Sequence, residues 1–217
     1  MNVRLALIGG GDLAQQLTHY VRTYEKKVEI IGFVDDFAIK GEEKFGLPCI
    51  GTVTDILDLY ACGQFDKVML SIGYKHQGTR QKLFEKLHPT VPFYTFIHPT
   101  AFVDATAKVG DGCCVGPHTV LEQRTIVGHN VFLYGGVNVS HDSKIGAHTF
   151  VAPSVAIAGF VDVGQRCFLG LHSTIIEHVR ITDDVALGAA SLVIHDLVEP
   201  GVYVGAPTRK KISHDYF

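Results

Sequence analysis

The chain has 217 residues, of which 47% are hydrophobic and 19% are charged, with a formal net charge of −3. This length allows one large domain or two small ones, and the apolar fraction excludes a mainly disordered chain. The small net charge carries no electrostatic signature for nucleic acid or an anionic membrane surface, so neither is expected as a partner.

The cysteines and the amino terminus point to a reducing compartment. The five cysteines are an odd number and form no C-x-x-C motif, which argues against a disulfide framework. Between Asn2 and Gly9 there is too little apolar sequence for a signal-peptide core or a membrane span. We therefore expect a cytoplasmic protein.

Residues 1–96 alternate short apolar runs with amphipathic stretches. Hydrophobic spacing predicts strands over residues 3–8, 28–34, 67–72 and 93–97. It predicts helices over residues 13–24, 54–61 and 79–87, the second of them with Thr54 as its N-cap. Strands that alternate with helices indicate an α/β domain with a parallel sheet and right-handed crossovers.

A glycine turn follows the first predicted strand. Residues 9–14 (GGGDLA) fit the pattern G-x-G-x-x-A, and Asp35 follows about 20 residues later, as in a dinucleotide-binding fingerprint. A full dinucleotide fold needs two βαβαβ halves, so a domain ending at residue 96 suits a mononucleotide better. The alternative is a turn that only lets helix and strand pack closely. We expect a Rossmann-like nucleotide-binding domain over residues 1–96.

From Ile97 onward the hydrophobic pattern has a period of six residues. An aliphatic residue occupies the first position of every hexad from Ile97 to Val193, without an insertion. The fifth position holds nothing larger than valine until Leu197. One large and one small residue facing inward in each hexad describe a parallel β-helix with 18 residues in each coil. We therefore expect an all-β prism, with a tail, over residues 97–217.

The histidines concentrate in this second region. In an 18-residue coil, residues that differ by 18 stack in one column, so Gly159 lies one coil beyond His141. Gly159 has no side chain to obstruct the imidazole, and Asp142 stands beside the ring. Within one chain, no pair of histidines stands out as metal ligands, so no metal is expected; the alternative is a metal bound across a trimer interface. Three other histidines are expected on outward turns or at subunit interfaces, and two cysteines are expected to point inward: His129, His148, His178, Cys113 and Cys167.

The hexads, the segment 138–142 (NVSHD) and Gly159 resemble the hexapeptide-repeat acyltransferases. With the amino-terminal domain included, the chain is similar to nucleotide-sugar N-acetyltransferases and to sialic acid O-acetyltransferases. The resemblance implies a left-handed β-helix, a homotrimer with active sites between neighbouring prisms, and acetyl-CoA as co-substrate. It also implies that His141 is the general base, that Asp142 orients it, and that the Gly159 amide contacts the thioester carbonyl.

The resemblance implies two binding surfaces as well. Residues at the glycine turn, the acidic pair and a later I-G segment would bind the nucleotide: Gly9, Gly10, Gly11, Asp12, Asp35, Asp36, Ile72 and Gly73. The G-x-P-[AT]-[RK] ending would lie beside coenzyme A: Gly205, Ala206, Pro207, Arg209 and Lys210. The chain departs from the family at Asp12, where members often have histidine, and at Phe150, where some have a second histidine.

The resemblance implies an enzyme of glycan biosynthesis. The expected reaction transfers acetyl from acetyl-CoA directly to the amino group of a nucleotide-linked sugar of the 4-amino-4,6-dideoxy type. One alternative is O-acetylation of sialic acid or a related sugar by the same residues. Another is a non-catalytic or zinc-binding β-helix protein, which calorimetry with coenzyme A and elemental analysis for zinc would identify.

Overall fold

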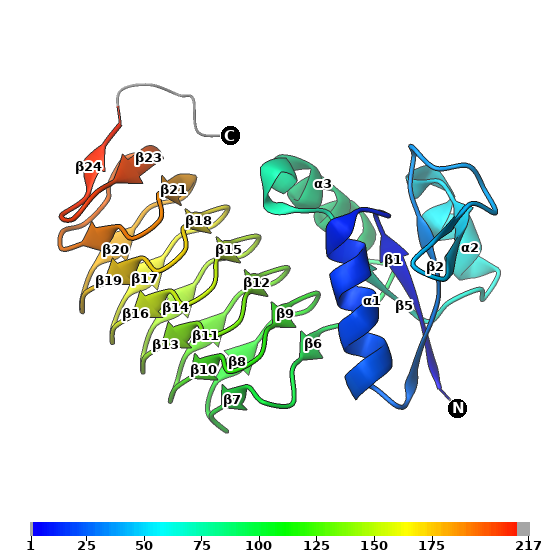
Figure 1. Cartoon of the computed structure of the whole chain (residues 1–217), viewed down its shortest axis with the longest axis horizontal. Coiled ribbons are helices and arrows are strands. Elements are labelled where there is room, and N and C mark those ends of the chain that lie inside the picture. Colours follow the sequence, from blue (N-terminus) through cyan, green and yellow to red (C-terminus); the bar gives the residue numbers. More distant parts are fainter. Residues whose placement is uncertain (1, 212–217) are drawn as a thin grey trace. The chain divides into compact units, whose positions relative to one another are not determined.

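The computed structural model describes residues 2–211, and the chain divides into two compact units, Met1–Phe96 and Ile97–Phe217 (Figure 1). Within the described residues, no helix has both the length and the apolar character needed to cross a membrane.

The first unit contains a five-stranded sheet in the order β3-β4-β2-β1-β5. Four of its strands are parallel, and β3 runs antiparallel to β4. The strands are β1 (Val3–Ile8), β2 (Val28–Val34), β3 (Glu43–Lys44), β4 (Leu47–Gly51) and β5 (Lys67–Leu70). The sequence prediction missed β3, which has only two residues, and β4, in which Pro48 interrupts the usual strand signature.

Helices connect these strands. They are α1 (Asp12–Tyr24), α2 (Ile56–Ala61) and α3 (Gln77–Leu87), with short 3₁₀ turns η1 (Val53–Asp55) and η2 (Tyr74–His76) before the last two. The prediction of Thr54 as an N-cap is wrong, because Thr52 caps this segment through two 2.8 Å bonds, from its N–H and its hydroxyl, to Asp55 Oδ2. The predicted strand over residues 93–97 shrinks to Phe96–Ile97 (β6) and one isolated bridge at Phe93.

Both faces of the first sheet are buried. Ala6 and Ile8 of β1 belong to a cluster that includes Phe84 and Leu87 of α3. Successive side chains of a strand point to opposite faces, so Leu5 and its alternate neighbours face the other side. Figure 1 shows α1 lying along the sheet, and the residues of α1 that are buried follow helical spacing: Leu13, Ala14, Leu17, Thr18 and Val21.

The second unit is a prism of three sheets, whose strands are parallel except for the antiparallel pair β23–β24 (Figure 1). Leu121 pairs with Val139, and Val139 pairs with Ile157, so neighbouring strands are 18 residues apart, as predicted. The strands are β7 (Phe102–Val103), β8 (Lys108–Val109), β9 (Cys114–Val115), β10 (Val120–Leu121), β11 (Ile126–Val127), β12 (Phe132–Leu133), β13 (Asn138–Val139), β14 (Lys144–Ile145), β15 (Phe150–Val151), β16 (Ala156–Ile157), β17 (Asp162–Val163), β18 (Phe168–Leu169), β19 (Thr174–Ile175), β20 (Arg180–Ile181), β21 (Val185–Leu187), β22 (Leu192–Val193), β23 (Gly201–Val204) and β24 (Arg209–Lys210).

The interior of the prism follows the hexads. Cys113 and Cys167, at fifth positions, have no exposed surface, which confirms that they point inward. Ile97 is an exception to the inward pattern, with 38% of its surface exposed. It lies in the first coil, which has no preceding coil within this unit to cover it.

The turns of the prism adopt a conformation that is unusual for residues other than glycine. The fourth residue of a hexad has a positive φ in many coils, for example 59° at Arg124, 61° at Asp142 and 59° at Phe160. The conformational cost of the positive φ is offset in each of these coils, because the backbone N–H of the fourth residue hydrogen-bonds to a neighbouring coil. Asp142 N–H donates to Gln123 O at 3.0 Å, and Phe160 N–H donates to His141 O at 3.1 Å.

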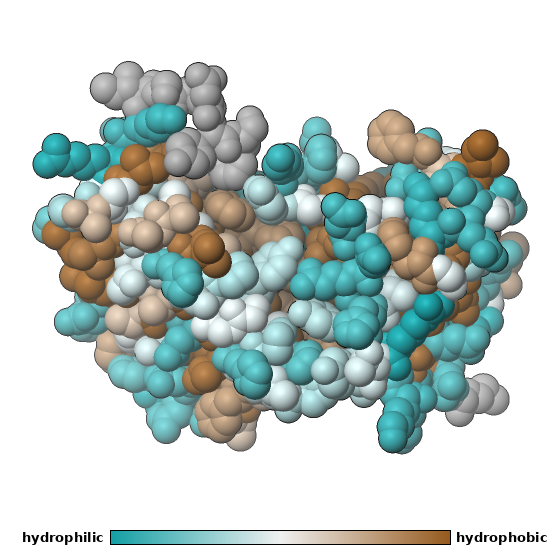
Figure 2. All heavy atoms as spheres, viewed as in Figure 1, coloured by the Kyte–Doolittle hydropathy of each residue, from teal (hydrophilic) through white to brown (hydrophobic). Residues whose placement is uncertain are grey.

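The prism surface mixes polar and apolar side chains. Figure 2 shows hydrophobic and hydrophilic residues interspersed over the visible face. Large apolar residues of this unit that remain exposed are Ile97, Phe102, Ile126, Phe160, Leu171 and Val198.

Candidate active site

His141 and Asp142 occupy the turn after β13, and backbone bonds hold this turn to the coils on both sides. His141 N–H donates to Glu122 Oε2 at 3.0 Å, and Asp142 N–H donates to Gln123 O, both in the preceding coil. His141 O accepts from Phe160 N–H in the following coil. The backbone of the dyad is therefore fixed before any ligand is present.

The two side chains meet as the sequence predicts, and a third joins them. His141 Nδ1 lies 2.9 Å from Asp142 Oδ2. Arg124, one coil earlier, donates from Nε to Asp142 Oδ1 at 2.6 Å and from Nη2 to Oδ2 at 2.7 Å. The hydrogen bond with Arg124 and, to a smaller extent, that with His141 hold the pKa of Asp142 well below its usual range.

This arrangement selects one tautomer of His141. An ionised carboxylate only accepts hydrogen bonds, so the proton on the imidazole must sit on Nδ1. The lone pair of the neutral ring is then on Nε2. The side chain of His141 is 46% exposed, so Nε2 is accessible to a bound molecule. The dyad thus leaves Nε2 as an accessible hydrogen-bond acceptor.

Gly159 provides space beside this ring. A Cβ added to Gly159 would lie 2.9 Å from His141 Cε1 and 3.1 Å from Nε2. Within residues 2–211 no acceptor receives the Gly159 N–H. A proton acceptor and an unpaired amide donor therefore lie side by side, as required for attack on a carbonyl whose oxygen gains negative charge.

Three further residues surround His141 and Asp142, and the sequence patterns did not single them out: Arg124, Glu122 and Phe160. The Phe160 ring meets His141 edge-on, with centroids 5.2 Å apart, and stacks on His178 at 5.0 Å. The column rule could have found two of them, because Arg124 precedes Asp142 by 18 residues and Phe160 follows it by 18.

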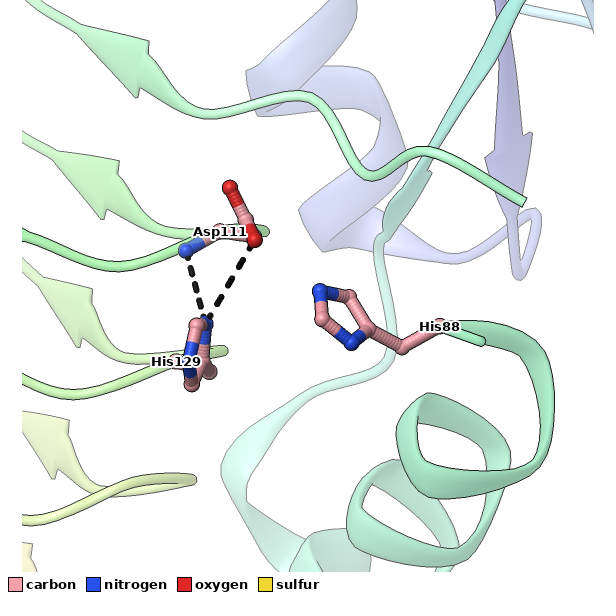
Figure 3. Close-up of side chains that lie close together, drawn as sticks. All are labelled: His88, Asp111 and His129. Atoms are coloured by element: carbon pink, nitrogen blue, oxygen red, sulfur yellow. Dashed lines mark hydrogen bonds and ion pairs between the residues drawn. The ribbon is translucent and has the colours of Figure 1, made fainter. Parts of the chain in front are cut away.

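Two other turn histidines are engaged differently. His129 Nδ1 accepts the Asp111 N–H at 3.0 Å and lies 3.7 Å from Asp111 Oδ2 (Figure 3). His148 is only 4% exposed, and its Nδ1 lies 2.9 Å from the buried Asn130 amide nitrogen. The prediction of an outward His148 is therefore wrong, because a polar partner one coil earlier compensates its burial.

The cysteines do not offer a nucleophile. No disulfide joins the five cysteines, and four of them are buried. Burial raises the pKa of the Cys167 thiol to about 12, so it stays protonated at neutral pH.

In the first unit, the glycine turn packs closely. Gly9 has φ +104°, which favours glycine, and a Cβ on Gly10 would lie 2.7 Å from Phe33 Cδ2. Gly10 N–H donates to Asp35 Oδ2 at 2.7 Å, and Phe37 N–H donates to Asp35 Oδ1 at 2.9 Å. Gly10 thus has the packing role that the sequence left open, and Asp35 ties the turn to the end of β2.

The other predicted nucleotide residues lie near this turn or at the same edge of the sheet. A Cβ on Gly9 would lie 3.1 Å from Ile72 Cγ1, so the turn and the I-G segment are neighbours. Gly73 precedes η2 and has open space around it. Asp36 accepts the Val53 N–H at 2.8 Å. The carboxyl ends of parallel strands are where α/β sheets bind ligands.

The amino terminus of α1 opens onto this edge. Gly11 is its N-cap, and Asp12 is its first residue. In the part of the chain that the structure describes, no acceptor receives the N–H groups of Gly11, Asp12 and Leu13. Unpaired amides at the start of a 13-residue helix are suited to an anion such as phosphate.

The carboxyl-terminal candidates form a hairpin. Gly205, Ala206 and Pro207 belong to the turn between β23 and β24, and Gly205 O accepts the Leu192 N–H at 3.0 Å. Lys210 Nζ is 2.7 Å from Glu199 Oε2, a bond that raises the pKa of the lysine and lowers that of the carboxyl. Of the two basic candidates, Lys210 is paired with an acid, and Arg209 is exposed.

Part of the chain is similar in sequence to known acyltransferases. Residues 97–199 match the family model described as GMPPB C-terminal domain. The UDP-3-O-acylglucosamine N-acyltransferase of Hahella chejuensis is 31% identical over 99 residues, 44% of this chain and 28% of that protein. The matched stretch therefore spans less than a third of that relative.

Solved structures resemble the whole chain. A histidine-to-asparagine mutant of perosamine N-acetyltransferase from Caulobacter crescentus, in complex with CoA and GDP-perosamine, has a TM-score of 0.88 at 28% identity. The match covers 96% of this chain and 97% of that one. The acetyltransferase domain of PglB from Neisseria gonorrhoeae FA1090, in complex with acetyl coenzyme A, has a TM-score of 0.83. It is 22% identical and covers 97% of this chain and all of that one, so it shows the shared fold alone.

Proposed function

We propose that this chain is a hexapeptide-repeat sugar acetyltransferase with a left-handed β-helix, and that it N-acetylates a nucleotide-linked amino sugar. The observation that carries the proposal is the proximity of His141 Nε2 to Gly159, whose N–H has no acceptor within residues 2–211. Likeness to the perosamine enzyme over nearly the whole chain supports it.

The proposed chemistry divides between three residues. Acetyl-CoA, the co-substrate, supplies the activated acetyl group. His141 Nε2 takes the proton from the attacking amine, which must be neutral to react. As the new C–N bond forms, the C–S bond of the thioester breaks, and coenzyme A leaves as its thiol with that proton. Asp142 holds the ring through Nδ1–H, and the Gly159 N–H stabilises negative charge on the carbonyl oxygen. Because Gly159 has no side chain to obstruct the ring, we assign the acetyl group to the region beside Nε2.

We assign the nucleotide to the first unit, as a Rossmann-like domain. The free N–H groups at the start of α1 would bind the phosphates, and Asp35 and Asp36 would accept bonds from the ribose. The sugar is proposed to be of the 4-amino-4,6-dideoxy type, and the enzyme to work in the cytoplasm on a glycan precursor. The hairpin residues Arg209 and Lys210 are proposed to bind the phosphates of coenzyme A.

A homotrimer is part of this proposal. The outward positions of the sheet that contains β13 are mostly apolar or uncharged: Phe102, Val120, Asn138, Ala156, Thr174 and Leu192. Those of the β14 sheet carry charge at four of five places: Lys108, Ile126, Lys144, Asp162 and Arg180. Of these two, the sheet that contains β13 is better suited to subunit contact. Light scattering should give three times the chain mass, and a monomer would contradict the assembly.

The direct test is a substrate panel. Purified protein is incubated with acetyl-CoA and with UDP-, dTDP- and GDP-linked 4-amino sugars, or with free sialic acid, and released coenzyme A is measured. We expect release with one nucleotide amino sugar and an N-acetylated product by mass spectrometry. Release with sialic acid alone would favour O-acetylation. No turnover, together with no coenzyme A binding in calorimetry, would overturn the proposal.

A further inference from the structure

Asp142 is held by two partners, and the stronger contact is not with the histidine. Arg124 engages both carboxylate oxygens, at 2.6 and 2.7 Å, whereas His141 reaches only Oδ2, at 2.9 Å. A bidentate contact between guanidinium and carboxylate restrains the plane of the carboxylate as well as its distance. The orientation of Asp142 is thus set from the coil before the catalytic turn.

We propose that Arg124 is a positioning residue, which fixes the Asp142 carboxylate so that His141 keeps its proton on Nδ1 and its lone pair on Nε2. The proposal deepens the acetyltransferase assignment and rests on it for the role of Nε2 as base. Arg124 itself reaches the reaction only through Asp142.

The surrounding charges explain why an arginine is needed. Glu122 binds the backbone N–H of His141, and Asp104 contributes a further negative charge that acts on Arg124. His178 lies beyond the Phe160 ring. Without Arg124, the Asp142 carboxylate would lack its cation among these acids and could rotate away from the imidazole. A neutral His141 could then place its proton on either nitrogen.

The same prism contains a matched pair without a histidine. Arg166 also occupies a fourth hexad position with positive φ, and it donates to Asp184, 18 residues later, through Nε and Nη2 at 2.8 Å each. The residue before Asp184 is Asp183, to which Arg166 also bonds. The Arg166 pair therefore joins two coils in the same way but has no imidazole to orient.

The experiment compares Arg124→Gln with Arg166→Gln in the full chain. Nitrogen chemical shifts of the ¹⁵N-labelled imidazole report the tautomer of His141 without any substrate. We expect one tautomer, Nδ1–H, in the wild type and in Arg166→Gln, and a mixture in Arg124→Gln. The variant Arg124→Gln should also lose kcat on the order of tenfold, with KM for acetyl-CoA nearly unchanged.

A third variant separates charge from geometry. Arg124→Lys keeps the cation but not the fork of two donors, so it should restore part of the kcat and part of the tautomer preference. It also serves as the test protein if Arg124→Gln does not fold, as judged by circular dichroism.

Each outcome decides the proposal. An Arg124 variant with the wild-type tautomer and the kcat of Arg166→Gln would overturn it. A tautomer mixture in a protein that acetylates none of the nucleotide sugars would leave Arg124 as the positioning residue and reject the acetyltransferase function instead.

Discussion

Replacement of His141 by alanine is expected to lower kcat by on the order of 10²–10⁴, because the neutral amine then loses its proton acceptor in the transition state. The affinity for acetyl-CoA should change little, since His141 acts on the nucleophile. Steady-state kinetics with the nucleotide amino sugar measure kcat, and calorimetry with coenzyme A measures the cofactor affinity.

His129→Ala is the matched control for this substitution. His129 occupies the same hexad position as His141, but its Nδ1 accepts the backbone N–H of Asp111, so this nitrogen carries no proton in that bond. The His129 variant should keep the wild-type kcat. Wild-type turnover in His141→Ala would exclude the general-base role and, with it, the proposed mechanism.

The substitution Gly159→Ala is expected to reduce kcat about 100-fold without unfolding the prism. The new methyl group would lie 2.9 Å from His141 Cε1, closer than such atoms approach, so the imidazole must move. A side-chain ring can shift at small cost to stability, but a displaced Nε2 no longer lines up with the amine. The thermal unfolding midpoint should therefore change far less than the rate.

Gly135→Ala makes the same change at the same hexad position, away from the dyad. Its added Cβ would lie 3.2 Å from the Pro117 carbonyl oxygen, which belongs to the backbone and yields less easily. We expect this control to lose more stability and less activity than Gly159→Ala. The reverse ranking would mean that Gly159 serves packing and not catalysis.

Much of the architecture follows from local sequence patterns. A hexad starting at Ile97 repeats without insertion, and a pattern that regular has only one way to bury its aliphatic positions, which is a coil of three short strands. The same repeat places His141 and Gly159 in one column. In the first unit, strands β1 and β2 were predicted with the observed bounds, because each ends in a buried run, Leu5–Ile8 and Gly32–Val34, that has no charged residue.

Weaker local signals failed where distant partners decide the outcome. The short strands β3 and β4 carry too few residues, or a proline, to be recognised. His148 was expected on the surface because most turn histidines lie there, but Asn130 in the preceding coil provides the bond that makes burial possible. Pairings of this kind depend on side-chain direction, which periodicity does not contain.

In the candidate site, too, some features follow from local sequence and others depend on contacts between distant residues. The sequence alone determined the column that holds His141 and Gly159, and the adjacent Asp142, because these follow from residue type and an 18-residue repeat. Only the tertiary structure decided that Arg124 holds Asp142 by two bonds, that His141 Nδ1 lies 2.9 Å from Asp142 Oδ2, and that the Gly159 N–H has no acceptor within residues 2–211. The physical reason is that hydrogen bonds depend on distances of a few tenths of an ångström and on rotamers, which are set only when the coils stack.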